Sequence, residues 1–278
     1  MEFGAFLEIT RPHNCVLAGV VAVLGSIVAL GHFPPLFKSM MAFLVVFLGC
    51  SGGNTINDYF DYEIDAINRP NRPIPRGAIP RSIALYYSLL LFSVGLFVSW
   101  TINLYAFILA VLAYSTMILY AWKLKYAPLI GNLAVGGLTG ATPLYGAVAV
   151  GKIGLAGTLA LCAFTVNVAR EIIKDIEDYR GDVLKGARTL PVVIGKRKAA
   201  LVGSFFGFLT ITFSFLPVMK GIGLGYLSMI PVDAIILYSS VLILLNQDRG
   251  TAKRAQLLLK FSIFLAVLAF MVASLCRG

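Results

Sequence analysis

Residues 38–65 read KSMMAFLVVFLGCSGGNTINDYFDYEID. An apolar run long enough to cross a bilayer therefore leads directly into a cluster of carboxylates. Only 13% of the 278 residues are charged, about half the share of a soluble domain, and the mean hydropathy is +0.86. This composition indicates a helical integral membrane protein, because a spanning β-barrel would show short alternating segments instead.

Eight more apolar stretches of similar length occur along the chain. We therefore predict an all-α fold, a bundle of about nine transmembrane helices that forms a single domain over residues 1–278. The stretch 1–14 has the apolar side chains of a short helix lying on the membrane surface. The predicted spans are residues 14–32, 38–57, 82–101, 104–122, 129–150, 153–173, 199–218, 224–245 and 257–276.

Basic residues are distributed unevenly between the two sides of such a bundle. Of the 23 Lys and Arg residues, 19 fall in the N-terminal segment and the loops after the even-numbered spans, and four on the other side. Basic residues mark the cytoplasmic side, so we predict a multi-pass cell-membrane protein with a cytoplasmic N-terminus. The net charge of +10 then reflects topology and not a nucleic-acid partner. Twelve of the 13 acidic residues share this side, the exception being Asp233, for which the sequence suggests no function.

The acidic residues are concentrated in two copies of one motif. Residues 58–65 and 175–182 both read D-x-x-D-Y-x-x-D, and 117 positions separate them. Each copy follows an even-numbered span, and the two spans are four apart. This arrangement predicts an internal repeat of four helices, with one motif contributed by each half.

Helical geometry places the polar residues of each motif on one stripe. Residues four apart share a face, so Asn57, Asp61 and Asp65 form one stripe, and Asp178 and Asp182 form the other. Two facing stripes of anions repel each other unless a cation lies between them. Mg²⁺ suits such a site, since it binds one or two carboxylates together with substrate phosphates. We therefore predict carboxylates, Mg²⁺ and a diphosphate at the cytoplasmic end of the bundle.

Basic residues beside the motifs complete the predicted site. Cations near a leaving diphosphate stabilise the charge that develops as its bond breaks. The residues expected to do so are Arg72, Arg76, Lys123, Lys125, Arg170, Lys174, Lys185 and Arg188.

A charged site above an apolar bundle suits a substrate with a charged head and a hydrocarbon tail. A prenyl diphosphate has both, and loss of its diphosphate leaves an allylic cation that an acceptor attacks. The ring faces of Tyr59, Phe60 and Tyr62 are candidates to stabilise that cation. The predicted reaction is therefore prenyl transfer.

The sequence resembles the UbiA superfamily of intramembrane prenyltransferases in its motifs, and the resemblance extends over the whole chain. The resemblance is carried by N-D-x-x-D-x-x-x-D from Asn57, then N-R-P at 68–70 and R-P-I-P-R-G at 72–77. K-D-x-x-D-x-x-x-D from Lys174, with R-T-L-P at 188–191, carries it in the second half. R-P-H-N at 11–14 and W-K-L-K at 122–125 also look like family positions.

The resemblance implies roles for individual residues. The Mg²⁺–diphosphate ligands would be Asn57, Asp61, Asp65, Asp178 and Asp182, and the four aspartates would be catalytic. Asp58 and Asp175 lie off the main stripes and would either touch the metal or orient its ligands. Residues implied to contact substrate are Arg11, Asn14, Arg72, Lys123, Lys125, Arg170, Lys174, Lys185 and Arg188.

Within the superfamily, the first motif and its N-R-P-N-R-P-I-P continuation look most like the archaeal ether-lipid branch. Members of that branch transfer a geranylgeranyl group from geranylgeranyl diphosphate to the hydroxyl of geranylgeranylglyceryl phosphate, a lipid-phosphate acceptor. Tyr62 stands where quinone-pathway members often have Arg, which favours this acceptor over an aromatic one.

Other interpretations stay open. The same fold would also prenylate a quinone precursor of the 4-hydroxybenzoate type, another aromatic acid or a porphyrin. A cation transporter would use the paired carboxylates as an ion pathway, but its polar site should lie near the bilayer midplane. The sequence does not fix the prenyl length, the number of metal ions or the oligomeric state.

Several residues also have simpler interpretations. Asn132 and Asn167 are expected to form interhelical hydrogen bonds or to serve the site. Close helix packing, together with a groove for a hydrocarbon tail, is expected at Gly131, Gly136, Gly137 and Gly140, and plain packing at Cys15, Cys50, Cys162 and Cys276.

Overall fold

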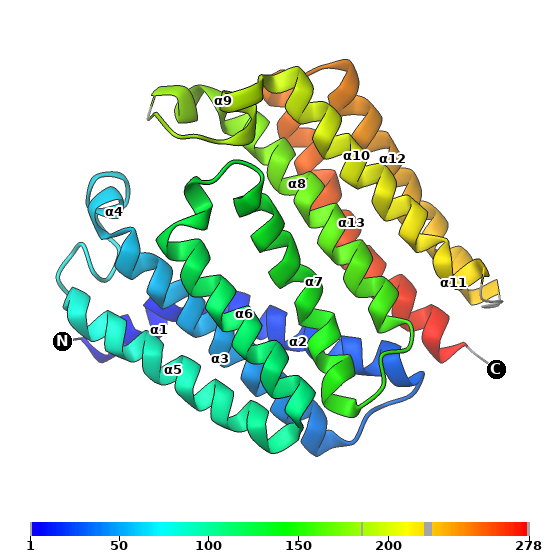
Figure 1. The fold of residues 1–278 in the computed structure, drawn as a ribbon, viewed down its shortest axis with the longest axis horizontal. Coiled ribbons are helices and arrows are strands. Elements are labelled where there is room, and N and C mark those ends of the chain that lie inside the picture. Colours follow the sequence, from blue (N-terminus) through cyan, green and yellow to red (C-terminus); the bar gives the residue numbers. More distant parts are fainter. Residues whose placement is uncertain (1, 185, 220–223, 277–278) are drawn as a thin grey trace.

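The computed structural model describes residues 2–184, 186–219 and 224–276, and within these ranges the regular structure is entirely helical. Figure 1 shows the bundle. The α-helices are α1 Phe3–Thr10, α2 Pro12–Leu30, α3 Leu36–Phe60, α4 Tyr62–Asn68, α5 Arg81–Ile102, α6 Leu104–Trp122, α7 Ile130–Val150, α8 Ala156–Leu184, α9 Leu190–Ile194, α10 Lys196–Ser214, α11 Leu216–Met219, α12 Ile230–Leu245 and α13 Arg249–Leu275. Two short 3₁₀ helices are η1 Leu124–Tyr126 and η2 Leu224–Met229.

Nine helices in the described ranges are long and apolar enough to cross a membrane, and they coincide with the nine predicted spans. The predicted all-α membrane bundle is therefore confirmed. Two spans continue farther into the acidic motifs than predicted, because α3 ends at Phe60 and α8 at Leu184. Hydropathy detects where the apolar sequence ends, whereas the backbone hydrogen bonds of these helices continue into polar sequence.

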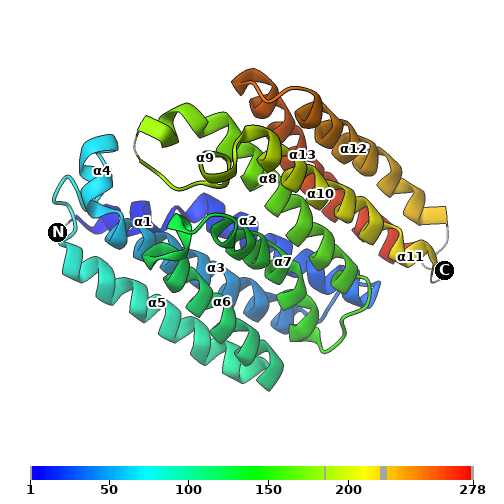
Figure 2. The same cartoon turned by 45° about the horizontal axis from the view of Figure 1, so that its top comes forward.

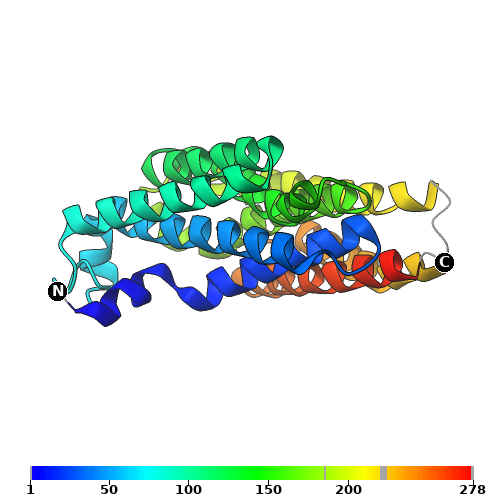
Figure 3. The ribbon, with the colours of Figure 1, turned by 90° about the horizontal axis from the view of Figure 1, so that it is seen from below.

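Both acidic motifs lie at one end of the bundle, which we call the motif end. Figures 1 and 3 show α4 and the N-terminus at this end and α11 with the C-terminus at the opposite end. The short helix α9 also lies at the motif end, across from α4 (Figure 1). The fold therefore brings together two sequence segments separated by more than one hundred residues.

The two halves of the chain pack in the same order, as the predicted repeat requires. In the first half α2 packs on α3, α3 on α5 and α5 on α6; in the second, α7 packs on α8, α8 on α10 and α10 on α12. The ninth span, α13, packs against α8 and α12 and also against α2. Figure 2 shows α13 beside α8 and α12. The last helix thus closes the contact between the two halves.

Glycines allow close approach between neighbouring helices, both within the second half and across the two halves. A Cβ added to Gly146 would lie 1.7 Å from the carbonyl oxygen of Ala22, so α2 and α7 touch backbone to backbone. The packing predicted at Gly136 and Gly140 is confirmed, with Val168 and Ala160 as the nearest neighbours. Gly131 packs closely on the backbone at Leu124.

The close packing predicted at Gly137 is wrong, because a Cβ there meets nothing within 4 Å. Successive residues of a helix point about 100° apart, so the neighbour of a packed glycine need not be packed.

The predicted N-terminal helix is present as α1. Its buried face, which includes Ala5 and Ile9, packs on Ile74 and Ile79 of the loop that follows α4. Phe3 on the opposite face is 88% exposed. The helix therefore docks on that loop through one face and presents an apolar residue on the other.

Candidate active site

The first motif spans a break between two helices. α3 ends at Phe60, and Asp61 leads into α4 with φ −84° and ψ 6°. Two helical hydrogen bonds cross the break, from the Asp61 N–H to the Asn57 carbonyl (2.9 Å) and from the Asp65 N–H to the Asp61 carbonyl (2.8 Å). The predicted stripe of Asn57, Asp61 and Asp65 is therefore preserved, and Asn57 Nδ2 donates to Asp61 Oδ2 at 2.9 Å.

Every aspartate of the first motif is paired with a basic side chain. Asp58 forms ion pairs with Arg11 and with Arg72, whose Nη1 lies 3.1 Å from Asp58 Oδ1. Arg72 also pairs with Asp65, and Lys125 pairs with Asp61. Asp58 and Asp65 are buried, with exposed fractions of 3% and 6%. Buried carboxylates need such partners, so this cluster is charge-balanced in the protein alone.

Arg11 reaches Asp58 from the junction of α1 and α2. Its backbone is left-handed, with φ 51° and ψ 63°, which is a costly conformation for a residue with a Cβ. Asn54 holds this junction, since its Nδ2 donates to the Thr10 carbonyl at 2.8 Å. The conformation therefore directs one guanidinium of the N-terminal segment into the first motif.

Arg76 ties α1 to the loop that carries Arg72. Its guanidinium donates two hydrogen bonds to Glu8, at 2.9 and 2.7 Å, and the Glu8 carboxylate raises the pKa of Arg76. Arg76 therefore fixes the loop against α1 and contacts no motif carboxylate among its described interactions. It lies in the loop after the first motif, as predicted, and its contact with the diphosphate stays a prediction.

The second motif lies on an unbroken helix, α8, of 29 residues. Asp175 accepts a hydrogen bond from Asn132 Nδ2 on α7 at 3.0 Å, which confirms the interhelical bond predicted for Asn132. Asp182 accepts one from Thr189 Oγ1 at 3.0 Å. In the described part of the chain the Asp178 carboxylate is exposed and makes no hydrogen bond or ion pair. This motif therefore keeps an uncompensated anion.

A polar cavity of about 60 Å³ joins the two halves at the motif end. Its lining includes Lys125, which pairs with Asp61, together with Asn132, Glu171 and Asp175 from the second half. A second polar cavity, of about 380 Å³, is lined by Asp178, Asp182 and Arg249 among others. Asp175 of the second motif therefore lines the same cavity as Lys125, the partner of Asp61, whereas Asp178 and Asp182 line a separate one.

Oxygen ligands dominate this site, as Mg²⁺ requires. Among the residues that the structure describes, no three Asp, Glu, His or Cys side chains are grouped closely enough to hold a metal by themselves. Mg²⁺ keeps waters and is usually held by one or two carboxylates plus substrate phosphates. Asn57 with Asp61, and the exposed Asp178, fit such an incomplete ligand set.

The remaining basic candidates differ in their surroundings. Arg170 pairs with Glu171, and Lys174 Nζ lies 3.8 Å from the same carboxylate. Lys123 is exposed just after α6, and Arg188 is exposed at the edge of the smaller polar cavity. Asn14 is exposed on the first turns of α2, whereas Lys185 lies outside the described residues.

The predicted role of the motif tyrosines in stabilising an allylic cation stays a prediction, and a cation of the protein already contacts two of the rings. The Arg81 guanidinium lies over both rings, 4.8 Å from the centroid of Tyr59 and 5.4 Å from that of Tyr62. A ring face already covered by a cation is not free for a second one. Phe60 packs edge-on against Tyr59.

Two residues at the site were not predicted from the sequence. Tyr120 lines the smaller polar cavity and stands at the end of an apolar span, two residues before the W-K-L-K segment. Thr189 positions Asp182, and its place in the R-T-L-P segment was the available signal.

An apolar cavity of about 350 Å³, partly open to the outside of the protein, lies between the helices of the bundle. Residues of α2, α3, α6, α7, α8 and α13 line it, including Cys50 on α3 and Val135 on α7. Cys50 is seven residues before Asn57 on the same helix, so the cavity begins roughly 10 Å from the first motif. The charged site therefore opens above an apolar space.

Residues 18–275 match the family model of the UbiA prenyltransferase family. The chain belongs to the UbiA prenyltransferase family. Among its relatives in this family is the digeranylgeranylglyceryl phosphate synthase of Thermococcus kodakarensis. The two sequences are 68% identical over 277 residues, and the alignment covers 100% of each chain. The predicted family and prenyltransferase class are therefore confirmed.

Solved structures of UbiA proteins share the fold. One, described as giving "Structural and mechanistic insights into the biosynthesis of Digeranylgeranylglyceryl phosphate synthase in membranes", superposes with a TM-score of 0.92 at 36% identity over 98% of each chain. A UbiA homolog from Archaeoglobus fulgidus, bound to GPP and Mg²⁺, has a TM-score of 0.68 at 15% identity, covering 96% of this chain and 99% of its own.

Proposed function

We propose that this chain transfers a geranylgeranyl group from geranylgeranyl diphosphate to the hydroxyl of geranylgeranylglyceryl phosphate. The bond between the acceptor oxygen and the first prenyl carbon forms, the bond from that carbon to diphosphate breaks, and the hydroxyl proton is released. The product carries the second ether bond of an archaeal membrane lipid. The full-length identity of 68% to a digeranylgeranylglyceryl phosphate synthase is the observation that carries this proposal.

The geometry supports a donor with its head at the motif end and its tail in the apolar cavity. Lys125, Arg72 and Arg11 form ion pairs with aspartates of the first motif and would bind the diphosphate, in addition to balancing the carboxylates. Positive charge fixed next to the leaving group stabilises the charge that develops on it. Removal of water from the apolar space protects the allylic cation from hydrolysis.

Mg²⁺ is proposed as the cofactor, held by Asn57, Asp61, Asp65, Asp178 and Asp182 together with the diphosphate. When bound, it supplies Lewis-acid stabilisation of the departing diphosphate. The structure of a related protein bound to GPP and Mg²⁺ supports metal dependence in the family. Asp58 is assigned to orienting Arg11 and Arg72, because both guanidinium groups occupy its carboxylate. Asp175 is assigned to a similar orienting role through Asn132.

The acceptor's phosphate requires additional positive charge at the same end. Lys123, Lys174 and Arg188 are exposed there and are less tightly paired than the residues of the first motif, so we assign them to acceptor recognition. The excess of basic residues on this side supports the proposal that the site faces the cytoplasm.

A competition assay tests the proposal. Purified protein would receive Mg²⁺, labelled geranylgeranyl diphosphate and equal amounts of geranylgeranylglyceryl phosphate and 4-hydroxybenzoate. We expect labelled product from the glyceryl phosphate alone, and none after excess chelator. Product from the aromatic acid alone would contradict the acceptor assignment and move the enzyme to quinone biosynthesis.

A further inference from the structure

The tyrosine inside each copy of the acidic motif lies under a basic side chain. This tyrosine follows the second aspartate of D-x-x-D-Y-x-x-D and is Tyr62 in the first copy and Tyr179 in the second. The Arg81 guanidinium lies 5.4 Å from the centroid of the Tyr62 ring, and Lys196 Nζ lies 5.1 Å from that of Tyr179. Both distances are within the ~6 Å of a cation–π contact. The two halves of the chain therefore repeat this contact as well as the carboxylates.

The two cations occupy equivalent places in the fold. Arg81 is the first residue of α5 and Lys196 is the first residue of α10, the spans that follow the two motifs. A cation at a helix N-terminus is disfavoured by the helix dipole, and the face of an aromatic ring offsets this. The constant offset of the motifs would assign Lys198 to the place of Arg81. Lys196 takes that place because the second half has 17 positions between tyrosine and cation where the first has 19.

Arg81 also contacts the last turn of α3. Its guanidinium lies 4.8 Å from the centroid of the Tyr59 ring, and its Nε donates a hydrogen bond to the Tyr59 carbonyl at 3.1 Å. Tyr59 belongs to α3 and Tyr62 to α4, and Asp61 stands between them at the break. One guanidinium therefore holds both sides of the break in the first motif.

The two rings under Arg81 belong to different apolar clusters. Tyr59 packs against the core of the first half, which includes Ile56. Tyr62 packs against the small cluster that α1 forms with the loop after α4, which includes Ile79. Arg81 thus connects two clusters whose relative position sets the direction in which α4 leaves α3.

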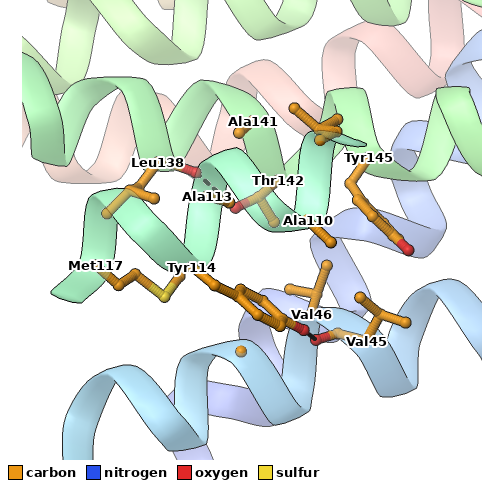
Figure 4. A pocket seen from close by; sticks show the side chains of 12 residues that line it. Val45, Val46, Ala110, Ala113, Tyr114, Met117, Leu138, Ala141, Thr142 and Tyr145 are labelled. Carbon is orange, nitrogen blue, oxygen red and sulfur yellow. Dashed lines mark hydrogen bonds between the residues drawn. The ribbon is translucent and has the colours of Figure 1, made fainter. Parts of the chain in front are cut away.

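The membrane part of α3 has a different support. In the apolar pocket of Figure 4, the Tyr114 hydroxyl donates to the Val45 carbonyl at 2.6 Å, and the Tyr114 ring lies against Gly49. Packing of this kind fixes a helix. Asp61 is twelve residues beyond Gly49, roughly 18 Å along the helix. The orientation of the break therefore depends on contacts at the motif end.

Building on the proposed Mg²⁺–diphosphate site, we propose that Arg81 is a positioning residue for Asp61. By clamping Tyr59 and Tyr62 it fixes the α3–α4 break and directs the Asp61 carboxylate toward the metal. Among the residues that the structure describes, the contacts of Arg81 are with these two tyrosines and not with a carboxylate, so its effect on the metal is indirect.

Lys196 has the same role for Asp178, through Tyr179. Its effect is smaller, because α8 is unbroken from Ala156 to Leu184 and its own backbone hydrogen bonds already hold Asp178. The tyrosine of the repeated motif is thus the ring on which each half anchors its central aspartate.

A positioning residue changes how readily the metal binds and not the reaction of the bound donor. Without the clamp, α4 adopts more directions, and a smaller fraction of molecules presents Asp61 correctly. Apparent affinity falls in proportion to that fraction. Turnover at saturating Mg²⁺ should therefore change less than the Mg²⁺ concentration that gives half-saturation, which we call the Mg²⁺ midpoint.

The test titrates Mg²⁺ against binding of a labelled geranylgeranyl thiolodiphosphate analogue to detergent-purified protein without acceptor. Arg81→Ala should raise the Mg²⁺ midpoint about fivefold, because a cation–π contact and a hydrogen bond are lost. Tyr62→Leu should raise it about threefold, and the double variant should match Arg81→Ala, since both act on one contact. Tyr62→Phe keeps the ring and should leave the midpoint unchanged.

Three results would overturn the role of Arg81. The first is an unchanged Mg²⁺ midpoint in Arg81→Ala, even with a lowered Tm, which would make the residue purely structural. The second is a midpoint raised in Arg81→Ala but not in Tyr62→Leu, which would indicate direct contact with the diphosphate. The third is a Tyr62→Leu variant that lowers only turnover at saturating Mg²⁺, which would return the ring to the allylic cation. If Arg81→Ala does not fold, Arg81→Lys keeps the charge without covering both rings and should give an intermediate midpoint.

The second half supplies a control matched for charge. Lys196→Ala and Lys198→Ala each remove one cation from the first turn of α10. Lys196→Ala should raise the Mg²⁺ midpoint about twofold, whereas Lys198→Ala should leave it unchanged. Equal effects of the two substitutions would indicate loss of charge alone and overturn the pairing with Tyr179.

Acceptor turnover separates this inference from the proposed function. The expected midpoint shifts without product from geranylgeranylglyceryl phosphate would reject the proposed acceptor and uphold the clamps. Product formation by wild-type protein, with the same midpoint in every variant, would uphold the proposed function and reject the clamps.

Discussion

The Asp58→Ala variant tests whether Asp58 orients two arginines or binds the metal. Asp58 is buried and pairs with both Arg11 and Arg72, whereas Asp61 pairs with Lys125 and hydrogen-bonds to Asn57. If Asp58 orients the guanidinium groups, its loss should reduce stability and donor binding and leave the Mg²⁺ requirement unchanged.

The magnitude follows from the exposure of the three partners. The side chains of Asp58, Arg72 and Arg11 are 4%, 17% and 28% exposed. Removing one partner of a buried ion pair costs about 3–5 kcal/mol. The lower end, ~3 kcal/mol, applies here because both arginines keep some contact with solvent and Arg72 keeps Asp65. At about 2–4 °C per kcal/mol for a chain of this size, Tm should fall by roughly 6–12 °C.

Intrinsic tryptophan fluorescence of detergent-purified protein during heating gives Tm, and a Mg²⁺ titration of turnover gives the metal midpoint. The double variant with Arg11→Ala supplies the control, since removing Arg11 should cost less stability once Asp58 is absent. A Tm change below about 2 °C, or a shift of the Mg²⁺ midpoint of more than tenfold, would refute this reasoning.

Three further outcomes are expected. Asp61→Ala and Asp178→Ala should each lower turnover at least a hundredfold with folded protein, because each removes a proposed Mg²⁺–diphosphate ligand; circular dichroism and the product assay check this, and full activity would contradict the metal site. Asp248 caps α13 by accepting a hydrogen bond from the Thr251 N–H at 2.8 Å, which lowers the pKa of Asp248. A lowered folded-state pKa means that the stabilisation is present above the unfolded pKa of about 4 and is lost as pH falls through the folded value. The Tm difference between wild type and Asp248→Ala should therefore be largest near pH 7 and disappear near pH 2; a difference that grows on acidification would oppose it. Cys276 is exposed at the end opposite the motifs. If the motif end is cytoplasmic, a membrane-impermeant maleimide added to intact cells should label the wild-type protein and leave the Cys276→Ser variant unlabelled.

Much of the fold was predictable because two independent signals coincide. Hydropathy located the nine spans, and the spacing of the repeated motif indicated that residues 58–65 and 175–182 occupy equivalent places. Helical periodicity then gave the stripe from Asn57 to Asp65, which the hydrogen bonds across the α3–α4 break preserve. Local sequence determines all of these features.

The partners of the motif residues were less predictable, because contacts between helices depend on how each helix is rotated. The pair of Arg11 and Asp58 joins positions 47 residues apart and depends on the left-handed backbone at Arg11. The tyrosines of the first motif were assigned to the substrate, yet Arg81 from α5 covers Tyr59. The directions of the Arg11 and Arg81 side chains are not specified by their neighbours in the sequence.

The position of α13 has a consequence for how the protein is made. This helix supplies Ile263, Phe264 and Val267 to the large apolar cavity and packs against α2, the first span. Synthesis proceeds from the N-terminus, so this wall is the last part of the cavity to enter the membrane. A nascent chain that ends after α12 already carries both acidic motifs but has a cavity open along one side. We therefore expect the ability to retain a prenyl tail to arise only when translation of the last span is complete.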